Sequence, residues 1–343
     1  MAAKRREYDE DDVRVRPGRS SRPRTRIRPR HTDAMPGFVV AVDRGRYTCV
    51  LTGEDRTVTA MRARELGRKS VVVGDQVALV GDVGGGPDSL ARIVRIEPRS
   101  SALRRTADDD DPSDRERVIV ANADQLVIVC SLQDPPPRTG FIDRCLVAAF
   151  DAGVRPLLCL TKADLPDASA ARDELVRYYA DLELEAVSCR PDEPLTELDS
   201  RLTDALSVLI GHSGVGKSTL VNRLVPGAGR AVGVVNAIGR GRHTSTSAVA
   251  LPLDGVDGWL VDTPGVRSFG LAHVSAETLL RAFPDLVEGS EDCPPNCGHD
   301  AHAARCGLDP WVASGHGSAH RLESYRRLLA SRSGDSGLWD AGA

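Results

Sequence analysis

The chain has 343 residues, 41% of them hydrophobic, and a formal net charge of −4 at pH 7. This length is enough for two or three domains with ordinary apolar cores. Apolar runs such as residues 206–210 are far too short to cross a membrane, and no signal-peptide pattern follows Met1. We therefore expect a cytoplasmic protein without a membrane-spanning segment.

The N-terminal residues are strongly basic. Residues 1–31 contain eleven Lys and Arg against five Asp and Glu, and Arg14 to Arg30 includes eight arginines and no acid. Such a segment has too few apolar side chains to fold, so residues 1–33 are predicted to form a disordered basic arm. Its charge suits the phosphates of RNA, and the alternative is a tail that only aids solubility.

Residues 34–100 contain short alternating runs, which predict strands at 38–42, 47–51, 57–60, 76–80 and 91–96. Five short strands within about sixty residues favour a small β-barrel. Between the third and fourth strands lie basic residues that either bind nucleic acid or form a solvated loop: Arg62, Arg64, Arg68 and Lys69. Residues 101–117, with consecutive aspartates at 108–111, are predicted to be a linker.

From residue 118 onward, strand-like and helix-like segments alternate. Strands are predicted at 118–120, 126–130, 154–160, 182–187, 205–210 and 258–261, and helices at 141–150 and from residue 220. This alternation predicts an α/β fold with a mostly parallel sheet that is covered by helices on both faces.

Two segments that follow predicted strands have the pattern of guanine-reading loops. Thr161, Lys162, Ala163 and Asp164 resemble the NKxD motif of GTPases, with Thr in the Asn position. The Asp164 carboxylate suits N1–H and the 2-amino group of guanine, a pair of donors that adenine lacks. Ser188 and Cys189 resemble the SAK loop, whose backbone amide meets O6 of guanine, although a serine after a strand is also common.

The most specific motif is the phosphate-binding pattern G-x-x-x-x-G-K-[ST] between a predicted strand and a helix. Its glycines allow backbone amides to surround a pyrophosphate at a helix N-terminus. Lys217 is expected to reach the β- and γ-phosphates and Ser218 to bind Mg²⁺. The alternative is a glycine-rich turn without a ligand. The residues predicted to contact GTP here are Gly211, His212, Ser213, Gly214, Val215, Gly216, Lys217, Ser218 and Thr219.

A glycine-rich run at residues 226–242 predicts a switch loop after the phosphate loop. Either Thr244 or Thr246 is suited to complete the Mg²⁺ coordination when a γ-phosphate is present. Further along, Asp262 lies at a predicted strand end and suits a Mg²⁺-bound water, while the amide of Gly265 suits the γ-phosphate.

Val266 occupies the position where Ras-like enzymes place a water-orienting glutamine. An apolar side chain cannot orient water, so intrinsic turnover is expected to be slow, or another residue must act. His243 is the candidate catalytic residue beside Lys217, because a neutral imidazole can position water near pH 7. A contact of His243 with RNA or with the loop backbone is the alternative.

These motifs occur in an unusual order, because the base-reading segments precede the phosphate loop. The chain therefore resembles a circularly permuted GTPase, and over residues 36–306 it resembles the ribosome small-subunit-dependent GTPase A family (RsgA, also called YjeQ). The resemblance implies an OB-fold for the barrel and a C-terminal zinc-binding domain. It also implies a GTPase that binds the small ribosomal subunit and its rRNA, and that couples hydrolysis to late 30S maturation and its own release.

Two other functions fit parts of the pattern. One is a P-loop ATPase or kinase, against which Asp164 argues. The other is an RNA-binding protein that uses GTP or GDP mainly as a structural or regulatory ligand, which the apolar Val266 favours.

The eight cysteines form two groups. Three of them gather with a histidine in one loop, and three thiolates with an imidazole predict one closed, structural Zn²⁺ site: Cys293, Cys297, His299 and Cys306. The family has a similar pattern with slightly different spacing, which keeps His302 as an alternative to His299. The other cysteines are expected to be mostly buried and reduced: Cys49, Cys130, Cys145, Cys159 and Cys189.

After this loop, an apolar stripe is predicted to pack on the zinc loop: Leu322, Tyr325, Leu328 and Leu329. The arginines are expected largely on the other faces, where a partner can reach them: Arg321, Arg326, Arg327 and Arg332.

We expect a monomer with a basic arm (1–33), an OB-fold barrel (34–100), a linker (101–117), a GTPase domain (118–275), a mainly helical zinc-binding domain (276–335) and a flexible tail (336–343).

Overall fold

The computed structural model describes residues 31–43, 45–54, 56–67, 71–86, 88–106, 116–182, 184–227, 248–263, 269, 271 and 273–331. Several predictions concern residues outside these ranges, namely the arm up to residue 30, the aspartates at 108–111 and the C-terminal tail. The same holds for Arg68, Lys69, His243, Thr244, Thr246, Gly265, Val266 and Arg332. Within the described ranges, no helix is both long enough and apolar enough to cross a membrane.

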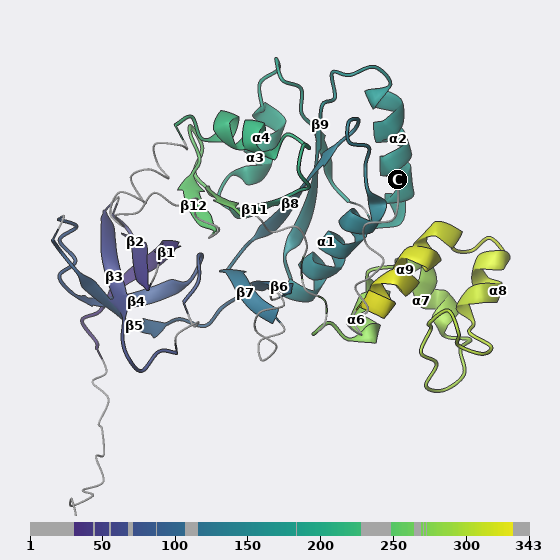
Figure 1. The fold of residues 1–343 in the computed structure, drawn as a ribbon, viewed down its shortest axis with the longest axis horizontal. Coiled ribbons are helices and arrows are strands. Elements are labelled where there is room, and N and C mark those ends of the chain that lie inside the picture. The colour runs from purple at the N-terminus through teal and green to yellow at the C-terminus, as the bar shows by residue number, and fades with distance from the viewer. Residues whose placement is uncertain are drawn as a thin grey trace, which may run out of the picture. The chain divides into compact units, whose positions relative to one another are not determined.

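The first strands form the predicted barrel. They are β1 (Met35–Asp43), β2 (Arg46–Leu51), β3 (Thr57–Arg62), β4 (Gln76–Gly81) and β5 (Ala91–Ile96). They pair in the order β1-β2-β3-β5-β4, and β4 also pairs with β1, which closes the barrel (Figure 1). Its core is separate from the others and contains Val39, Cys49, Leu51, Leu79 and Ile93. The five-stranded barrel expected for an OB-fold is therefore confirmed.

Both ends of the segment predicted as a linker lie in regular structure. Strand β6 (Ala102–Thr106) pairs antiparallel with β7 (Glu116–Ala121) in a two-stranded sheet. Leu103 lies opposite Val120, and both side chains are fully buried in the largest core. Burial of this apolar pair explains why the chain is ordered here. The strand predicted at 118–120 exists, but it pairs with β6 and not with the parallel sheet.

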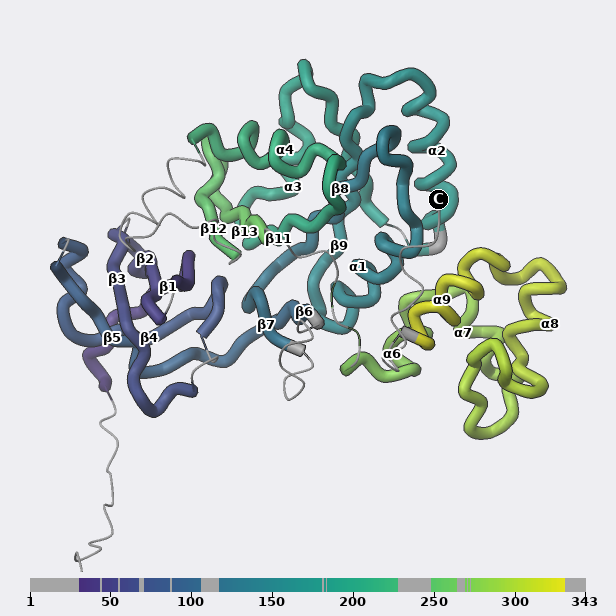
Figure 2. The backbone as a smooth tube through the Cα atoms, in the orientation of Figure 1, coloured from purple at the N-terminus to yellow at the C-terminus, as the bar shows by residue number. Residues whose placement is uncertain are grey.

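A mostly parallel sheet forms the centre of the α/β region. Its strands are β8 (Gln125–Ser131), β9 (Arg155–Thr161), β10 (Ala186–Ser188), β11 (Leu206–Ile210), β12 (Val249–Pro252) and β13 (Trp259–Asp262). They lie in the order β10-β9-β8-β11-β13-β12, and only β12 is antiparallel to its neighbour. Figure 2 shows that strands from distant parts of this region lie side by side.

Helices cover both faces of this sheet, and successive residues of a strand alternate between the two. Leu126 and Ile128 of β8 share a core with α1 (Thr139–Ala152) and α2 (Ala168–Tyr178). Val127 and Val129 pack instead with α3 (Thr196–Leu202) and α4 (Lys217–Leu224). A short 3-10 turn, η2 (Ala180–Leu182), follows α2. Burial on both faces explains the nearly continuous apolar sequence of the strands.

The C-terminal region consists of the helices α6 (Ala276–Arg281), α7 (Pro284–Ser290), α8 (Leu308–Ala313) and α9 (Ala319–Ser331). The stripe on α9 is buried as predicted at Leu322, Tyr325 and Leu328. The expectation of an outward-facing Arg321 is wrong, because its side chain is only 3% exposed. Its Nε lies 2.9 Å from Oδ1 of Asp285 on α7, and this carboxylate compensates the buried charge.

Arg326 of α9 is also held within the protein. Its guanidinium pairs with the carboxylate of Asp309 on α8 at 2.8 Å, and its Nε donates to the carbonyl of His299 at 3.2 Å. The second bond confirms that α9 packs on the Cys/His loop. Arg327 is exposed, as expected, and lies 3.5 Å from Glu323 on the same helix.

Candidate nucleotide-binding site and metal centre

The predicted nucleotide-contacting segments meet at one edge of the sheet. Strands β8, β9, β10, β11 and β13 are parallel, so their carboxyl ends lie on the same side. The base-reading segments follow β9 and β10, the phosphate loop follows β11, and Asp262 is the last residue of β13. In open α/β sheets, ligands bind in crevices outside the carboxyl ends of the strands.

A direct hydrogen bond joins the first base-reading segment to the phosphate loop. The Thr161 hydroxyl donates to the carbonyl of Val215 at 2.6 Å, although these residues are 54 positions apart in the sequence. A Cβ atom built on Gly216 would lie 3.7 Å from Oγ1 of Thr161. The two loops are therefore in contact through Thr161.

The phosphate loop has the local geometry that its sequence predicts. Gly216 has φ +86° and caps α4, which begins at Lys217. A Cβ at Gly211 would lie 2.7 Å from the carbonyl of Val129, so this position has no room for a side chain. The Val215 side chain is buried, whereas Ser213, Gly214, Ser218 and Thr219 are exposed. The loop thus presents accessible backbone at the N-terminus of a helix, which favours anions.

Lys217 and Asp262 form an ion pair beside this loop. Nζ of Lys217 lies 2.8 Å from Oδ1 of Asp262, and the two side chains are 18% and 33% exposed. The neighbouring Thr263 donates from its hydroxyl to the carbonyl of Leu209 at 2.8 Å, which ties the end of β13 to β11. A cation and a carboxylate that were both predicted from motifs are therefore adjacent.

The two base-reading segments are hydrogen-bonded to one another. The amide of Ala163 donates to the carbonyl of Cys189 at 3.5 Å, and the amide of Cys189 donates to the carbonyl of Leu160 at 2.7 Å. The Cys189 amide can therefore meet guanine O6 only by sharing or exchanging that bond. The Asp164 side chain is exposed at the same edge, and Ser188 is the exposed last residue of β10.

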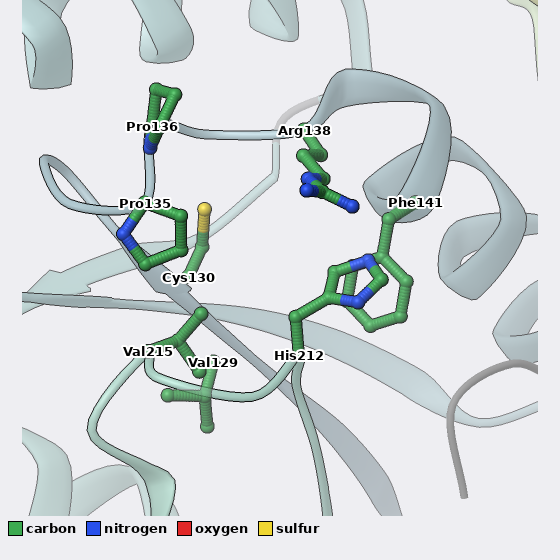
Figure 3. Close-up of a pocket in the computed structure, with 8 residues that line it drawn as sticks. All are labelled: Val129, Cys130, Pro135, Pro136, Arg138, Phe141, His212 and Val215. Atoms are coloured by element: carbon green, nitrogen blue, oxygen red, sulfur yellow. The ribbon is translucent and has the colours of Figure 1, made fainter. Parts of the chain in front are cut away.

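The loop after β8 completes this edge and was not identified from the sequence. The carbonyl of Asp134 accepts a hydrogen bond from Nζ of Lys162. The ring of His212 lies against that of Phe141, with centroids 4.2 Å apart, and burial together with Arg138 lowers the pKa of His212. Figure 3 shows these rings at one side of a small depression. The volume of this depression is about 250 Å³, open mouth included. The lining is mostly apolar: Val129, Cys130, Pro135, Pro136, Arg138, Phe141, His212 and Val215.

Helix α1 also contacts the C-terminal region, another feature that the motifs do not reveal. Asp143 is buried, and its carboxylate accepts hydrogen bonds from Ser324 of α9 and, at 2.8 Å, from Tyr179. Burial raises the pKa of Asp143, and the two donors oppose this effect. The adjacent Arg144 donates to the carbonyl of Phe269 at 3.0 Å, just beyond the Asp262 strand. One turn of helix thus contacts both α9 and this segment.

The Cys/His cluster is gathered as predicted. The ligand atoms of Cys293, Cys297, His299 and Cys306 all lie within 4.8 Å of one another. Nδ1 of His299 lies 3.4 Å from Sγ of Cys293 and 3.7 Å from Sγ of Cys306. His302 is not a member of this group. The structure therefore groups His299, and not His302, with the three cysteines.

The donor set fits a tetrahedral metal ion. Three thiolates and one imidazole favour zinc, and four protein ligands leave no open position for catalysis. The amide of Gly307 donates to Sγ of Cys293 at 3.1 Å, the kind of outer contact that orients a metal-binding sulfur. This group could hold a metal ion such as zinc.

The order of the elements defines the class of the protein. The segments that resemble base-reading loops begin at the ends of β9 and β10 and precede the phosphate loop, while the parallel sheet brings all of them to one edge. This arrangement is that of a circularly permuted GTPase. A sequence model of the family described as RsgA GTPase matches residues 96–272.

Curated relatives agree with this match. The chain is 40% identical over 268 residues to the small ribosomal subunit biogenesis GTPase RsgA of Ectopseudomonas mendocina, covering 76% of this chain and 75% of the relative. It is 34% identical over 309 residues to the protein of the same name from Chlorobaculum parvum, covering 87% and 98%. The chain belongs to the RsgA GTPase family.

Solved structures support the fold. YjeQ from Thermotoga maritima superposes with a TM-score of 0.64 over 88% of this chain and 99% of that one. YloQ, described as a circularly permuted GTPase, gives a TM-score of 0.62 over 90% and 98%. Both are 24% identical to this chain, so the likeness concerns the fold alone.

Proposed function

We propose that this protein is a cytoplasmic GTPase that binds the small ribosomal subunit and its rRNA. GTP hydrolysis is coupled to late 30S maturation and to release of the protein. Membership of the RsgA GTPase family and the names of the relatives support the proposal. The observation that carries it is the contact between Thr161 and Val215, because it joins the two segments that must hold opposite ends of one nucleotide.

In this proposal, Asp164 accepts from N1–H and the 2-amino group of guanine, and the stem of Lys162 lies along the base. Ser188 and Cys189 form the wall beside O6. The amides of residues 211–219 surround the phosphates. The exposed hydroxyl of Ser218 binds Mg²⁺, together with Thr244 or Thr246.

Lys217 and Asp262 give up their ion pair when nucleotide binds, and each takes a new partner. The ammonium group of Lys217 lies against the Asp262 carboxylate at 2.8 Å. The phosphates of GTP are a stronger anionic partner, so Lys217 turns toward them. The Asp262 carboxylate is then free to hold a Mg²⁺-bound water, and the amide of Gly265 meets the γ-phosphate.

Intrinsic hydrolysis is slow in this proposal, because Val266 cannot orient the attacking water. His243 supplies this role when the ribosomal subunit rearranges the site. Lys217 stabilises the charge that develops on the transferred phosphoryl group.

The proposed domain bounds are those predicted from the sequence, with the linker shortened to the residues between β6 and β7. One Zn²⁺ ion holds the loop of the Cys/His cluster together in a structural role. The contacts of α1 with Ser324 and Phe269 give a path by which the GTP state changes how the C-terminal region docks.

The test is GTP turnover by the full chain with and without purified 30S particles. We expect stimulation of at least about tenfold, and tighter binding to the particles with a non-hydrolysable GTP analogue than with GDP. The variant Lys217→Ala is the control for GTP hydrolysis by contaminating enzymes, because this variant should have almost no turnover of its own.

Two results would contradict the proposal. Equal turnover in both conditions, with equal binding in both nucleotide states, would remove it altogether. Nucleotide-dependent binding without any turnover would favour an RNA-binding protein that uses the nucleotide only as a regulatory ligand.

A further inference from the structure

Thr161 occupies the first position of the base-reading segment, where GTPases usually have asparagine. Its side chain is buried at the end of β9, and two oxygens lie within hydrogen-bond distance of its hydroxyl. These are the carbonyl oxygens of Val215 at 2.6 Å and of Cys130 at 3.3 Å. A hydroxyl group has one proton to donate, and both neighbours can only accept. The proton is therefore committed to the protein.

Guanine presents only acceptors, N7 and O6, on the edge opposite its N1–H and 2-amino groups. An asparagine carboxamide has two N–H donors, so it can hold a neighbouring carbonyl and still donate to the base. A threonine whose single proton goes to Val215 has nothing left to donate to N7.

We infer that Thr161 is a positioning residue that fixes the phosphate loop through Val215 and makes no hydrogen bond to N7 of guanine. This inference rests on the proposed function, since it concerns the same guanine nucleotide. It changes the role of Thr161 from a base contact to a tie between the two ends of the site.

The hydrogen bond from Thr161 to Val215 restrains a part of the phosphate loop where the backbone has unusual freedom. Val215 stands between Gly214 and Gly216, which have φ values of +82° and +86°, so the backbone on both sides has the freedom of glycine. The Thr161 bond fixes the carbonyl between them. Loss of the hydroxyl leaves this carbonyl without that donor and lets the loop depart from the arrangement that surrounds phosphates.

The experiment compares GDP with 7-deaza-GDP, in which a C–H replaces N7, on the full-length protein. Affinities are measured by titration for the wild type, Thr161→Val and Thr161→Ser. Thr203→Val is the matched control, because its exposed hydroxyl also donates to a carbonyl, that of Asp199 at 2.9 Å, but it precedes β11 at the other edge of the sheet.

We expect Thr161→Val to weaken binding of both nucleotides about tenfold, and Thr161→Ser to restore it to within about twofold. The ratio of the two affinities stays the same in all variants, and Thr203→Val binds like the wild type. If Thr161→Val does not fold, Thr161→Ala carries the same expectations without adding a methyl group.

Three outcomes would overturn the inference. A penalty for 7-deaza-GDP that is present in the wild type and disappears in Thr161→Val would show a contact with N7. Unchanged binding by Thr161→Val would show that the hydroxyl of Thr161 does not fix the phosphate loop. Binding by Thr161→Ser as weak as that of Thr161→Val would assign the effect to the methyl group. A wild type that binds no guanine nucleotide would instead refute the proposed function, and the inference with it.

Discussion

The residues that meet at the nucleotide-binding edge of the sheet are far apart in the sequence, whereas those of the Cys/His cluster are close together in it. Thr161 and Val215 are 54 positions apart and Lys217 and Asp262 are 45 apart, whereas Cys293 and Cys306 are 13 apart. The first group is assembled by a sheet with helices on both faces, so its geometry depends on a large apolar core. The second lies in one loop, so its geometry depends on the ion that its donors would bind.

Metal removal is expected to have the largest effect and to separate the two regions. Structural zinc with such ligands contributes on the order of 10 kcal/mol, so its loss should unfold the loop between α7 and α8. We expect about one zinc per chain by elemental analysis, and its loss in Cys297→Ser. Hydrogen exchange should then rise in α7–α9 while the parallel sheet stays protected.

The matched control for this change is Cys49→Ala. Cys49 is buried in the separate core of the barrel, away from the cluster. This variant should retain its zinc. A wild type without bound zinc, or a sheet that loses protection together with the cluster, would remove the distinction between the two regions.

Lys217→Ala is expected to have the next largest effect, confined to the nucleotide edge. Loss of the ammonium group removes the stabilisation of transferring phosphoryl charge, so turnover should fall about a thousandfold or more. The unfolding midpoint should change little, because the ion pair with Asp262 is partly exposed. Arg172→Ala, which removes an exposed cation from α2, is the control. Substantial hydrolysis by Lys217→Ala would refute the role of the phosphate loop.

A smaller effect, on the free energy of unfolding, is expected from variants at the contact between α1 and α9. Asp143→Ala removes the buried carboxylate that accepts from Tyr179 and Ser324, and Tyr179 keeps only its longer bond to the carbonyl of Thr139 at 3.2 Å. We expect a loss of about 3 kcal/mol in the free energy of unfolding, measured with urea. Ser324→Ala should cost about 1 kcal/mol, and the exposed Asp173→Ala should cost almost nothing. Equal stability of all three variants would show that α1 does not hold α9.

The parts of the fold that depend on local pattern were predictable from the sequence. Strands β8 and β11 are buried on both faces, so each is a nearly continuous apolar run with clear ends. The Cys/His cluster was predictable because its ligands are close in sequence and belong to residue types that bind metals. Strand β6 was missed, because Leu103 is followed by Arg104 and Arg105, which suggested a solvated linker.

The parts that depend on distant partners were not predictable in this way. The pattern on α9 places Arg321 outside the apolar stripe, but Asp285, 36 residues earlier, compensates its charge in the interior. The buried Asp143 is similarly explained only by Tyr179 and by Ser324, which lies 181 residues away. At the nucleotide-binding edge, the motifs indicated which residues belong together. The hydrogen bond between Thr161 and Val215 could not be predicted from them, because it depends on how the sheet arranges the strands.

The central claim is that Asp164 and the phosphate loop hold the same guanine nucleotide, and Asp164→Asn tests it most directly. Xanthine carries a carbonyl where guanine has its 2-amino group, and an asparagine amide can donate to that carbonyl. We expect GTP affinity to fall about a hundredfold or more and xanthosine triphosphate to bind and be hydrolysed, while Asp173→Asn keeps the wild-type preference. Unchanged GTP affinity in Asp164→Asn, without a gain for xanthosine triphosphate, would contradict the account.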